Sequence, residues 1–234
     1  MKSVYLKGTL GACLFAVAMP ALASHEVYSP IVEQGEKELE LTTDYVTDSS
    51  SDDNHEVTHY LEAGYGIGPR WGSELLVEFE KPRGEGTDAE SVEWENVFQL
   101  SEQGEHFVDY GLFLELAKAL EDESPDEVAG GLLLQKEFGS VVSIINLIAA
   151  KQVGDNAEDE LEGEYSGQLR WRLDPRLEPT LEVYNKEEGT KVGTLLHGKF
   201  HLQKRSKLGY SIGMMWGADN DTPNTLRGSI EYEF

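Results

Sequence analysis

Polar and apolar residues alternate along most of this chain, and this two-residue period restricts the fold more than any other feature. Successive side chains of a β-strand point to opposite faces, so an alternating segment has one polar face and one apolar face. The sequence therefore predicts an all-β protein. Twelve segments show the alternation: Glu38–Tyr45, Glu56–Ala63, Glu74–Glu80, Val92–Leu100, Phe107–Leu116, Val128–Phe138, Val141–Ala150, Glu164–Leu173, Leu177–Tyr184, Val192–Leu202, Leu208–Trp216 and Leu226–Phe234.

The segments between these strands alternate between short turns and longer acidic loops. Short turns are predicted at Gly68–Arg70, Gln103–Glu105, Gly139–Ser140, Asp174–Arg176 and Lys204–Ser206. Longer loops are predicted at Thr47–Asn54, Pro82–Asp88, Glu121–Glu127, Gly154–Glu160, Lys186–Lys191 and Ala218–Asn224. Short periplasmic turns, longer outer loops and an even strand number are typical of outer-membrane barrels. We expect a 12-stranded antiparallel transmembrane β-barrel.

A soluble β-sandwich or lipocalin-like barrel would also alternate, but the aromatic residues favour a membrane barrel. On the apolar face they fall near the two strand ends, as two lipid–water interfaces require. We predict interfacial positions for Tyr45, Tyr65, Trp71, Trp94, Tyr110, Tyr165, Trp171, Tyr210 and Trp216.

The chain begins with features of an export signal. Lys2 and Lys7 precede the apolar run Leu10–Met19, and Pro20–Ala23 has small residues typical of a cleavage site. We predict a signal peptide over residues 1–23, a periplasmic segment over 24–36 outside the barrel, and the barrel over 37–234. A lipoprotein signal ending at Cys13 is an alternative. Cys13 is the only cysteine, so a disulfide scaffold, thiol catalysis and a Cys-ligated zinc site are excluded in the exported chain.

The last strand carries the motif by which the family resemblance is identified. Ile230, Tyr232 and Phe234 lie at two-residue steps and end in a terminal Phe. This resembles the insertion signal of bacterial outer-membrane proteins, although Gly228 is one position earlier than in its commonest form. The chain is similar to small porin-like barrels of about twelve strands. The resemblance implies an outer-membrane location and recognition of Tyr232 and Phe234 by the barrel-assembly machinery.

Charge indicates what the polar face can do. The chain has 44 acidic residues against 19 Lys and Arg, a net charge of −25, which repels nucleic acid. Strand parity places most of these acids inside the barrel with few cations. We predict a lumen lining that sets selectivity, formed by Glu62, Glu78, Glu93, Glu95, Asp109, Glu115, Glu164, Glu178, Glu182, Arg170, Arg172 and Lys199.

Unpaired buried carboxylates are too costly for a dry interior. A hydrated lumen with counter-cations predicts a passive, cation-preferring channel for small cationic or neutral hydrophilic solutes, because acidic rings select cations. A salt-bridged, closed interior is the alternative, and it would suit a structural or partner-binding barrel. Arg170, Arg172 and Lys199 are further expected to form a basic ladder facing the acids Glu93, Glu95, Glu178 and Glu182.

No local pattern marks a catalytic centre, and we predict no enzyme activity, cofactor or metal centre. Ser166 with His197 would be the basis of a hydrolase alternative, but neither lies in a nucleophile motif. The loop acids Asp52, Asp53 and Asp219 lack EF-hand spacing. Beside anionic lipopolysaccharide, which together with outer-membrane lipid is an expected partner, such loops would need bridging divalent ions.

Overall fold

The computed structural model describes residues 26–48, 51, 53–121, 124–157, 159–186, 189–202, 206–219 and 222–234. The predicted signal peptide, residues 1–23, lies outside the described residues. No helix among the residues described is both long enough and apolar enough to cross a bilayer.

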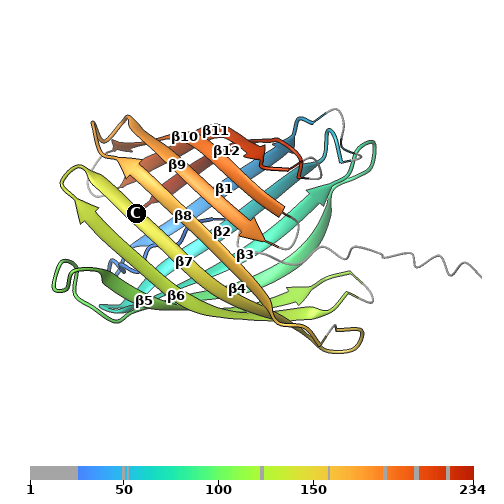
Figure 1. The fold of residues 1–234 in the computed structure, drawn as a ribbon, viewed down its shortest axis with the longest axis horizontal. Helices are drawn as coiled ribbons and strands as arrows, with labels where there is room; N and C mark the ends of the chain where they lie inside the picture. The colour runs from blue at the N-terminus through green and yellow to red at the C-terminus, as the bar shows by residue number, and fades with distance from the viewer. Residues whose placement is uncertain are drawn as a thin grey trace, which may run out of the picture.

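The described residues form twelve β-strands, one for each alternating segment of the sequence (Figure 1). Their bounds are β1 Lys37–Val46, β2 Val57–Gly68, β3 Trp71–Lys81, β4 Asp88–Gln99, β5 Asp109–Ala119, β6 Asp126–Phe138, β7 Val141–Val153, β8 Glu162–Trp171, β9 Glu178–Lys186, β10 Gly189–His201, β11 Lys207–Gly217 and β12 Thr225–Glu233.

Each strand pairs antiparallel with its neighbours in the sequence, and β1 pairs with β12 to close the barrel. The closing pair runs from Glu38 opposite Glu233 to Val46 opposite Thr225. The amide of Phe234 then donates to the carbonyl of Lys37 at 2.9 Å. A closed barrel leaves no unpaired sheet edge, which a hydrocarbon environment requires. The predicted antiparallel barrel is confirmed.

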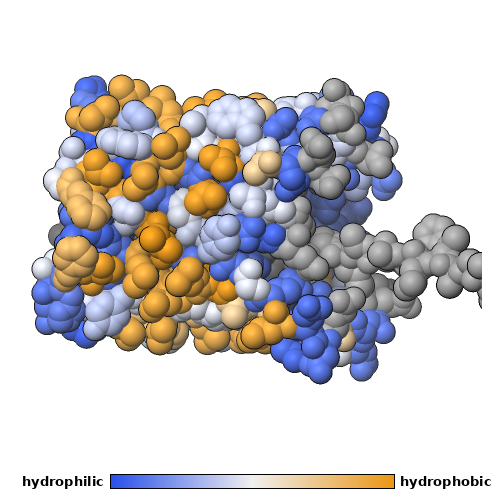
Figure 2. Space-filling model, viewed as in Figure 1, coloured by the Kyte–Doolittle hydropathy of each residue, from blue (hydrophilic) through white to orange (hydrophobic). Residues whose placement is uncertain are grey.

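The outer face of the barrel is apolar. Leu41, Leu61, Leu75, Leu147 and Ile212 are exposed there, and Figure 2 shows apolar side chains spread over the strands, with hydrophilic ones at both ends of the view.

The aromatic residues predicted for the interfaces lie on this outer face. Trp94 does not lie near a strand end, where we expected it. It lies midway along β4, and its indole N–H donates to Ser73 Oγ at 2.8 Å.

Two connections differ from the strict alternation of short and long that the sequence predicted. β4 and β5 are separated by residues 100–108, a longer connection than the predicted Gln103–Glu105 turn. It is ordered by its own side chains, since Gly104 N–H donates to Asp109 Oδ1 at 2.6 Å. The predicted outer loop Lys186–Lys191 is mostly strand, because β9 ends at Lys186 and β10 begins at Gly189.

The prediction that residues 24–36 lie outside the barrel is wrong for the part described. Residues 26–36 run along the lumen as an extended segment, called the inner segment below. Gly35 N–H donates to the Gly66 carbonyl at 2.8 Å, and Gly66 N–H donates to the Glu36 carbonyl at 3.0 Å. Tyr28 is 3% exposed. The inner segment follows the wall because its backbone and side chains find partners there.

Candidate channel lumen

The inner face of β1 to β5 carries a continuous series of carboxylates. Cross-strand partners include Glu40 opposite Glu62, and Glu95 lies opposite Glu74 on one side and Glu115 on the other. Among described residues, every buried charged residue is an acid: Glu62, Glu93, Glu95, Asp109, Glu115, Glu127, Glu164, Glu182 and Glu233.

Tyr28 fixes the inner segment to the middle of this wall. Its N–H donates to Asn146 Oδ1 at 2.8 Å, and its carbonyl accepts from Asn146 Nδ2 at 2.9 Å. The phenol donates to Glu95 Oε1 at 2.7 Å, and the ring stacks on Phe113 with centroids 4.4 Å apart. Asn146 on β7 therefore bonds the segment's backbone as a neighbouring strand would.

Further contacts hold the inner segment towards the short-turn end. Val32 N–H donates to Gln99 Oε1 at 2.9 Å, and Ser29 Oγ donates to Gln135 Oε1 at 2.9 Å. At its base, Lys207 Nζ lies 3.3 Å from Glu36 Oε1. Burial and the neighbouring Glu233 carboxylate, which accepts a hydrogen bond from the protonated Glu36, raise the pKa of Glu36. The segment is bonded along most of its length.

Part of the wall behind Tyr28 is apolar, which the sequence analysis did not anticipate for a lumen. Phe113, Ala129, Leu133, Ile148 and Ala150 form a buried cluster with Tyr28. The outward residues of β7, such as Leu147, are exposed to lipid. This strand is therefore apolar on both faces, because lipid covers one and the inner segment covers the other.

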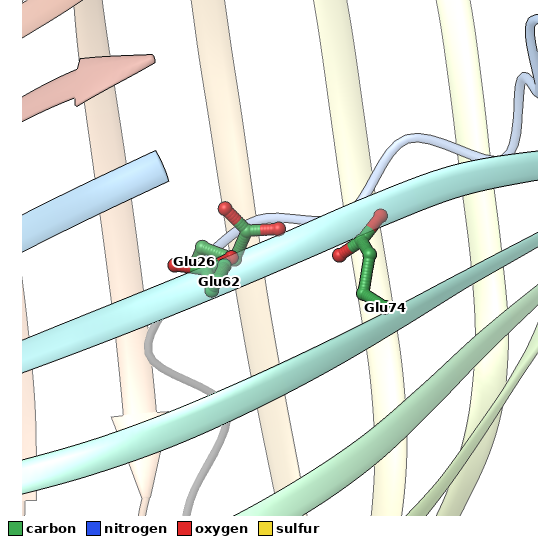
Figure 3. A group of neighbouring side chains, drawn as sticks. All are labelled: Glu26, Glu62 and Glu74. Atoms are coloured by element: carbon green, nitrogen blue, oxygen red, sulfur yellow. The ribbon is translucent and has the colours of Figure 1, made fainter. Parts of the chain in front are cut away.

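The inner segment adds an acid of its own to the acidic wall. Figure 3 shows Glu26 beside Glu62 of β2 and Glu74 of β3. One carboxylate oxygen from each of the three lies within 4.8 Å of the others. The segment thus adds to the negative charge of the wall where it passes β2 and β3.

The basic residues form ion pairs with acids of β6, β9 and β12, unlike the predicted ladder facing Glu93 and Glu95. Arg170 Nε is 3.6 Å from Glu178 Oε2, a pair consistent with the prediction. Arg172 instead binds Glu137 at 2.9 Å beside the β6–β7 turn. Lys199 pairs with Glu233 and, at 3.3 Å, with Glu231, both on β12. Parity gives the face on which a side chain lies, but it does not give the neighbour that it reaches.

Glu182 has several polar partners in the lumen. Its Oε1 accepts from Gln168 Nε2 at 2.8 Å, and its Oε2 accepts from the Tyr184 hydroxyl at 2.9 Å. His197 Nε2 also lies 3.6 Å from Oε1. Such a buried carboxylate is oriented by its donors and cannot swing freely into the bore.

Arg227 and Asp44 make the best-formed ion pair of the lumen. Arg227 Nε and Nη2 donate to the two Asp44 oxygens at 2.8 and 2.6 Å, a bidentate arrangement. The guanidinium also lies 5.4 Å from the centre of the Tyr184 ring. Arg227, Asp44 and Tyr184 form a group that we call the Arg227 constriction.

Two cavities meet at this constriction. The larger, of about 210 Å³, lies beside the inner segment, and residues of its lining include Glu26, Glu40, Glu178, Glu182 and Glu231. The smaller, of about 100 Å³, lies towards the outer loops and is lined by Tyr60, Lys186, Lys191 and Thr222. Arg227 and Tyr184 line both, so they separate the two cavities.

The remaining predicted lumen residues have less central places. Glu78 lies opposite Tyr60 on the inner face of β3. Glu164 lines a small recess near Tyr184. Asp109 accepts the hydrogen bond from Gly104 N–H in the β4–β5 connection.

The side chains considered for a hydrolase have other partners. Ser166 Oγ donates to Asn146 Oδ1 at 3.0 Å, while His197 lies beside Glu182. Of the loop acids, Asp52 is outside the described residues. Asp219 Oδ1 accepts from the amide and hydroxyl of Thr222 at 2.9 and 2.7 Å, which folds the β11–β12 loop on itself.

Comparisons with solved structures identify the architecture. The KdgM porin superposes with a TM-score of 0.59 at 8% identity, covering 84% of this chain and 99% of that one. An outer membrane channel from Pseudomonas putida F1 gives 0.60 at 11% identity, covering 86% and 96%. The NanC porin gives 0.55 at 10% identity, covering 83% and 97%.

The fold is that of the outer-membrane porins. No family model and no curated protein matches the sequence. At identities this low, the likeness establishes architecture, so the chemistry of the lumen must be argued from this chain's own residues.

The lumen residues missed by sequence reasoning are Tyr28, Asn146, Tyr184 and the pairing of Asp44 with Arg227. One signal was available. Asn146 interrupts the most apolar strand of the chain on its inward face, and a lone amide in such a place indicates a backbone or polar partner inside.

Proposed function

We propose that this protein is a passive, cation-preferring channel of the bacterial outer membrane for small cationic or neutral hydrophilic solutes. The observation that carries the proposal is the sign of the buried charge: each buried charged residue among the described residues is an acid. A low-dielectric wall focuses the field of these carboxylates into the bore, which enriches cations and excludes anions.

The same charge separates this chain from one of its structural neighbours. The KdgM porin has a structure in complex with disordered oligogalacturonate, an oligomer of a sugar acid. A polyanion would have to pass Glu26, Glu40, Glu178 and Glu231 of the larger cavity here. The electrostatic cost of that passage favours cations and neutral molecules as solutes of this barrel.

The inner segment sets the size limit. It occupies the lumen beside β2 to β7, and the space left is divided into cavities of about 210 and 100 Å³. Hydrated ions and solutes of a few heavy atoms fit such spaces, and oligosaccharides do not. Transfer between the cavities requires side-chain movement of Tyr184 or Arg227.

Ion substitution in single-channel recordings tests the proposal. Replacing Cl⁻ by a bulky anion should leave the conductance nearly unchanged, and replacing K⁺ by a bulky cation should reduce it strongly. The opposite pattern would refute cation preference. When Glu40, Glu178, Glu182 and Glu231 are all changed to Gln, the conductance change on replacing K⁺ should become closer to that on replacing Cl⁻. Glu85→Gln, an exposed residue of the outer β3–β4 connection, is the matched control and should leave the wild-type pattern unchanged.

The proposal includes three partners in the bacterial envelope: the barrel-assembly machinery, membrane lipid and lipopolysaccharide. The outward Tyr232 and Phe234 rings stack with centroids 5.5 Å apart at the end of the closing strand, where the barrel-assembly machinery would recognise them. Lipid would contact the apolar belt. Divalent ions would bridge the acidic outer loops to lipopolysaccharide.

A structural or partner-binding barrel is the second candidate, and the inner segment is the observation that favours it. A lumen crossed by a bonded segment and closed by the Arg227 constriction could serve as an anchor without conduction. Stoichiometric co-purification of an envelope partner, together with no conductance in bilayers, would favour this candidate over the channel.

A further inference from the structure

Three carboxylates meet on the inner face of β4 and β5, below the phenol of Tyr28. Glu93 and Glu95 project inward from β4, and Glu115 lies directly opposite Glu95 on β5. One oxygen from each lies within 4.8 Å of the others. Their exposed fractions are 5%, 2% and 2%. Such proximity of three buried acids requires positive charge or protons between them.

A second observation points to a bound cation. Glu95 Oε1 accepts the Tyr28 hydroxyl, but Glu95 Oε2 is inaccessible to solvent and has no hydrogen-bond partner among the described residues. Buried carboxylate oxygens are almost always bonded. An oxygen without a hydrogen-bond partner, on a buried residue that belongs to a group of three acids, can serve as a ligand atom.

The surroundings hold the triad in place. The Ser91 hydroxyl donates to Glu93 Oε1 at 2.6 Å. Glu95 is fixed by Tyr28, whose own backbone is bonded to Asn146. These contacts orient two of the three carboxylates.

The spacing discriminates between hard cations. Ca²⁺ binds oxygen at about 2.3–2.6 Å, so two ligands on opposite sides of the ion are up to about 5 Å apart. Mg²⁺ binds at about 2.0–2.1 Å, which limits that separation to about 4.2 Å. The three oxygens lie within 4.8 Å of one another, a range that Ca²⁺, with its flexible shell of oxygen ligands, spans in full and Mg²⁺ spans only in part.

We propose that Glu93, Glu95 and Glu115 form a Ca²⁺ site in the barrel wall, with water completing the coordination shell. The ion neutralises the triad, and Glu95 links it to the Tyr28 hydroxyl. Calcium thereby holds the inner segment in the lumen. The site is separate from the larger cavity, because none of the three acids lines it.

Calorimetric titration of the full chain in detergent, after chelator treatment, tests the site with CaCl₂ as the probe. We expect one saturable site per chain. Glu95→Gln and Glu115→Gln keep the side-chain shape and should each weaken binding at least tenfold. Glu164→Gln removes a buried lumen acid outside the triad and should leave binding unchanged. Glu62→Gln alters the neighbouring triad of Figure 3 and should also leave Ca²⁺ binding unchanged.

A second readout keeps the test valid if a variant fails to form the barrel. Tb³⁺ occupies calcium sites, and its luminescence would be excited through Tyr28 in the wild-type protein. Added Ca²⁺ should displace it, and Tyr28→Phe should reduce the signal. Absence of saturable Ca²⁺ binding by the wild type would overturn the proposal. So would unchanged binding by Glu95→Gln and Glu115→Gln, loss of binding in Glu62→Gln alone, or preference for Mg²⁺.

Discussion

Asn146→Leu should release the inner segment from the lumen. Leu has the branched shape of Asn but no polar atoms, so the substitution removes both bonds to Tyr28, at 2.8 and 2.9 Å, without opening a cavity. The Tyr28 N–H and carbonyl would then be buried without these partners. Each stranded group costs about 1–3 kcal/mol, or roughly 2–6 kcal/mol for the two. At about 1.4 kcal/mol per factor of ten, the released state should become at least roughly 30-fold more populated.

Amide hydrogen exchange measures this release directly. In the wild type, amides in residues 27–32 should exchange slowly, because they lie inside the barrel and several are bonded. In Asn146→Leu they should exchange at least roughly tenfold faster, and the channel conductance should rise as the lumen widens. Asn96→Leu is a matched control, since Asn96 is equally buried but bonds Trp71 on the outer face. Equal exchange in wild type and Asn146→Leu would refute the docking described above.

Three further substitutions test other parts of the structure. Arg227→Met should lower the free energy of unfolding by roughly 3–5 kcal/mol, because the Asp44 carboxylate loses its guanidinium. A lower unfolding temperature on heated gels would show this loss. Asp44→Asn in the same chain should restore much of the lost stability. Gly66→Ala should displace the base of the inner segment, because a Cβ there would overlap the Glu33 carbonyl oxygen, whereas Gly68→Ala has open space and should be neutral in the same exchange assay. Deletion of Phe234 should slow barrel assembly, measured as the rate at which the folded, heat-modifiable band forms, while a normal rate would argue against its role as a signal.

The barrel could be predicted from the sequence because its physical requirement is local and repeated. Every strand must present apolar residues to lipid at two-residue steps, so the pattern of Glu38–Tyr45 is informative without knowledge of its neighbours. The inward position of acids such as Glu95 and Glu115 follows from the same parity. Twelve alternating segments therefore correspond to the strands in the structure.

The contents of the lumen depend on contacts that parity does not specify. Lys199 was expected to face the acids of β4 and β9, but it pairs with Glu231 and Glu233 on β12. The position of Tyr28 depends on Asn146, which is 118 residues away in the chain. An extended segment without alternation has no local signal for its location. The double-sided apolarity of β7 was the indirect signal, since an inward Ile148 requires an apolar cover.

The reversal potential of the wild-type channel under a tenfold KCl gradient tests the central claim most directly. The carboxylates of the inner face should make K⁺ the more permeant ion, so the potential should approach the K⁺ equilibrium value and move towards zero at high salt as screening increases. A potential of the opposite sign, towards the Cl⁻ equilibrium value, would contradict the account.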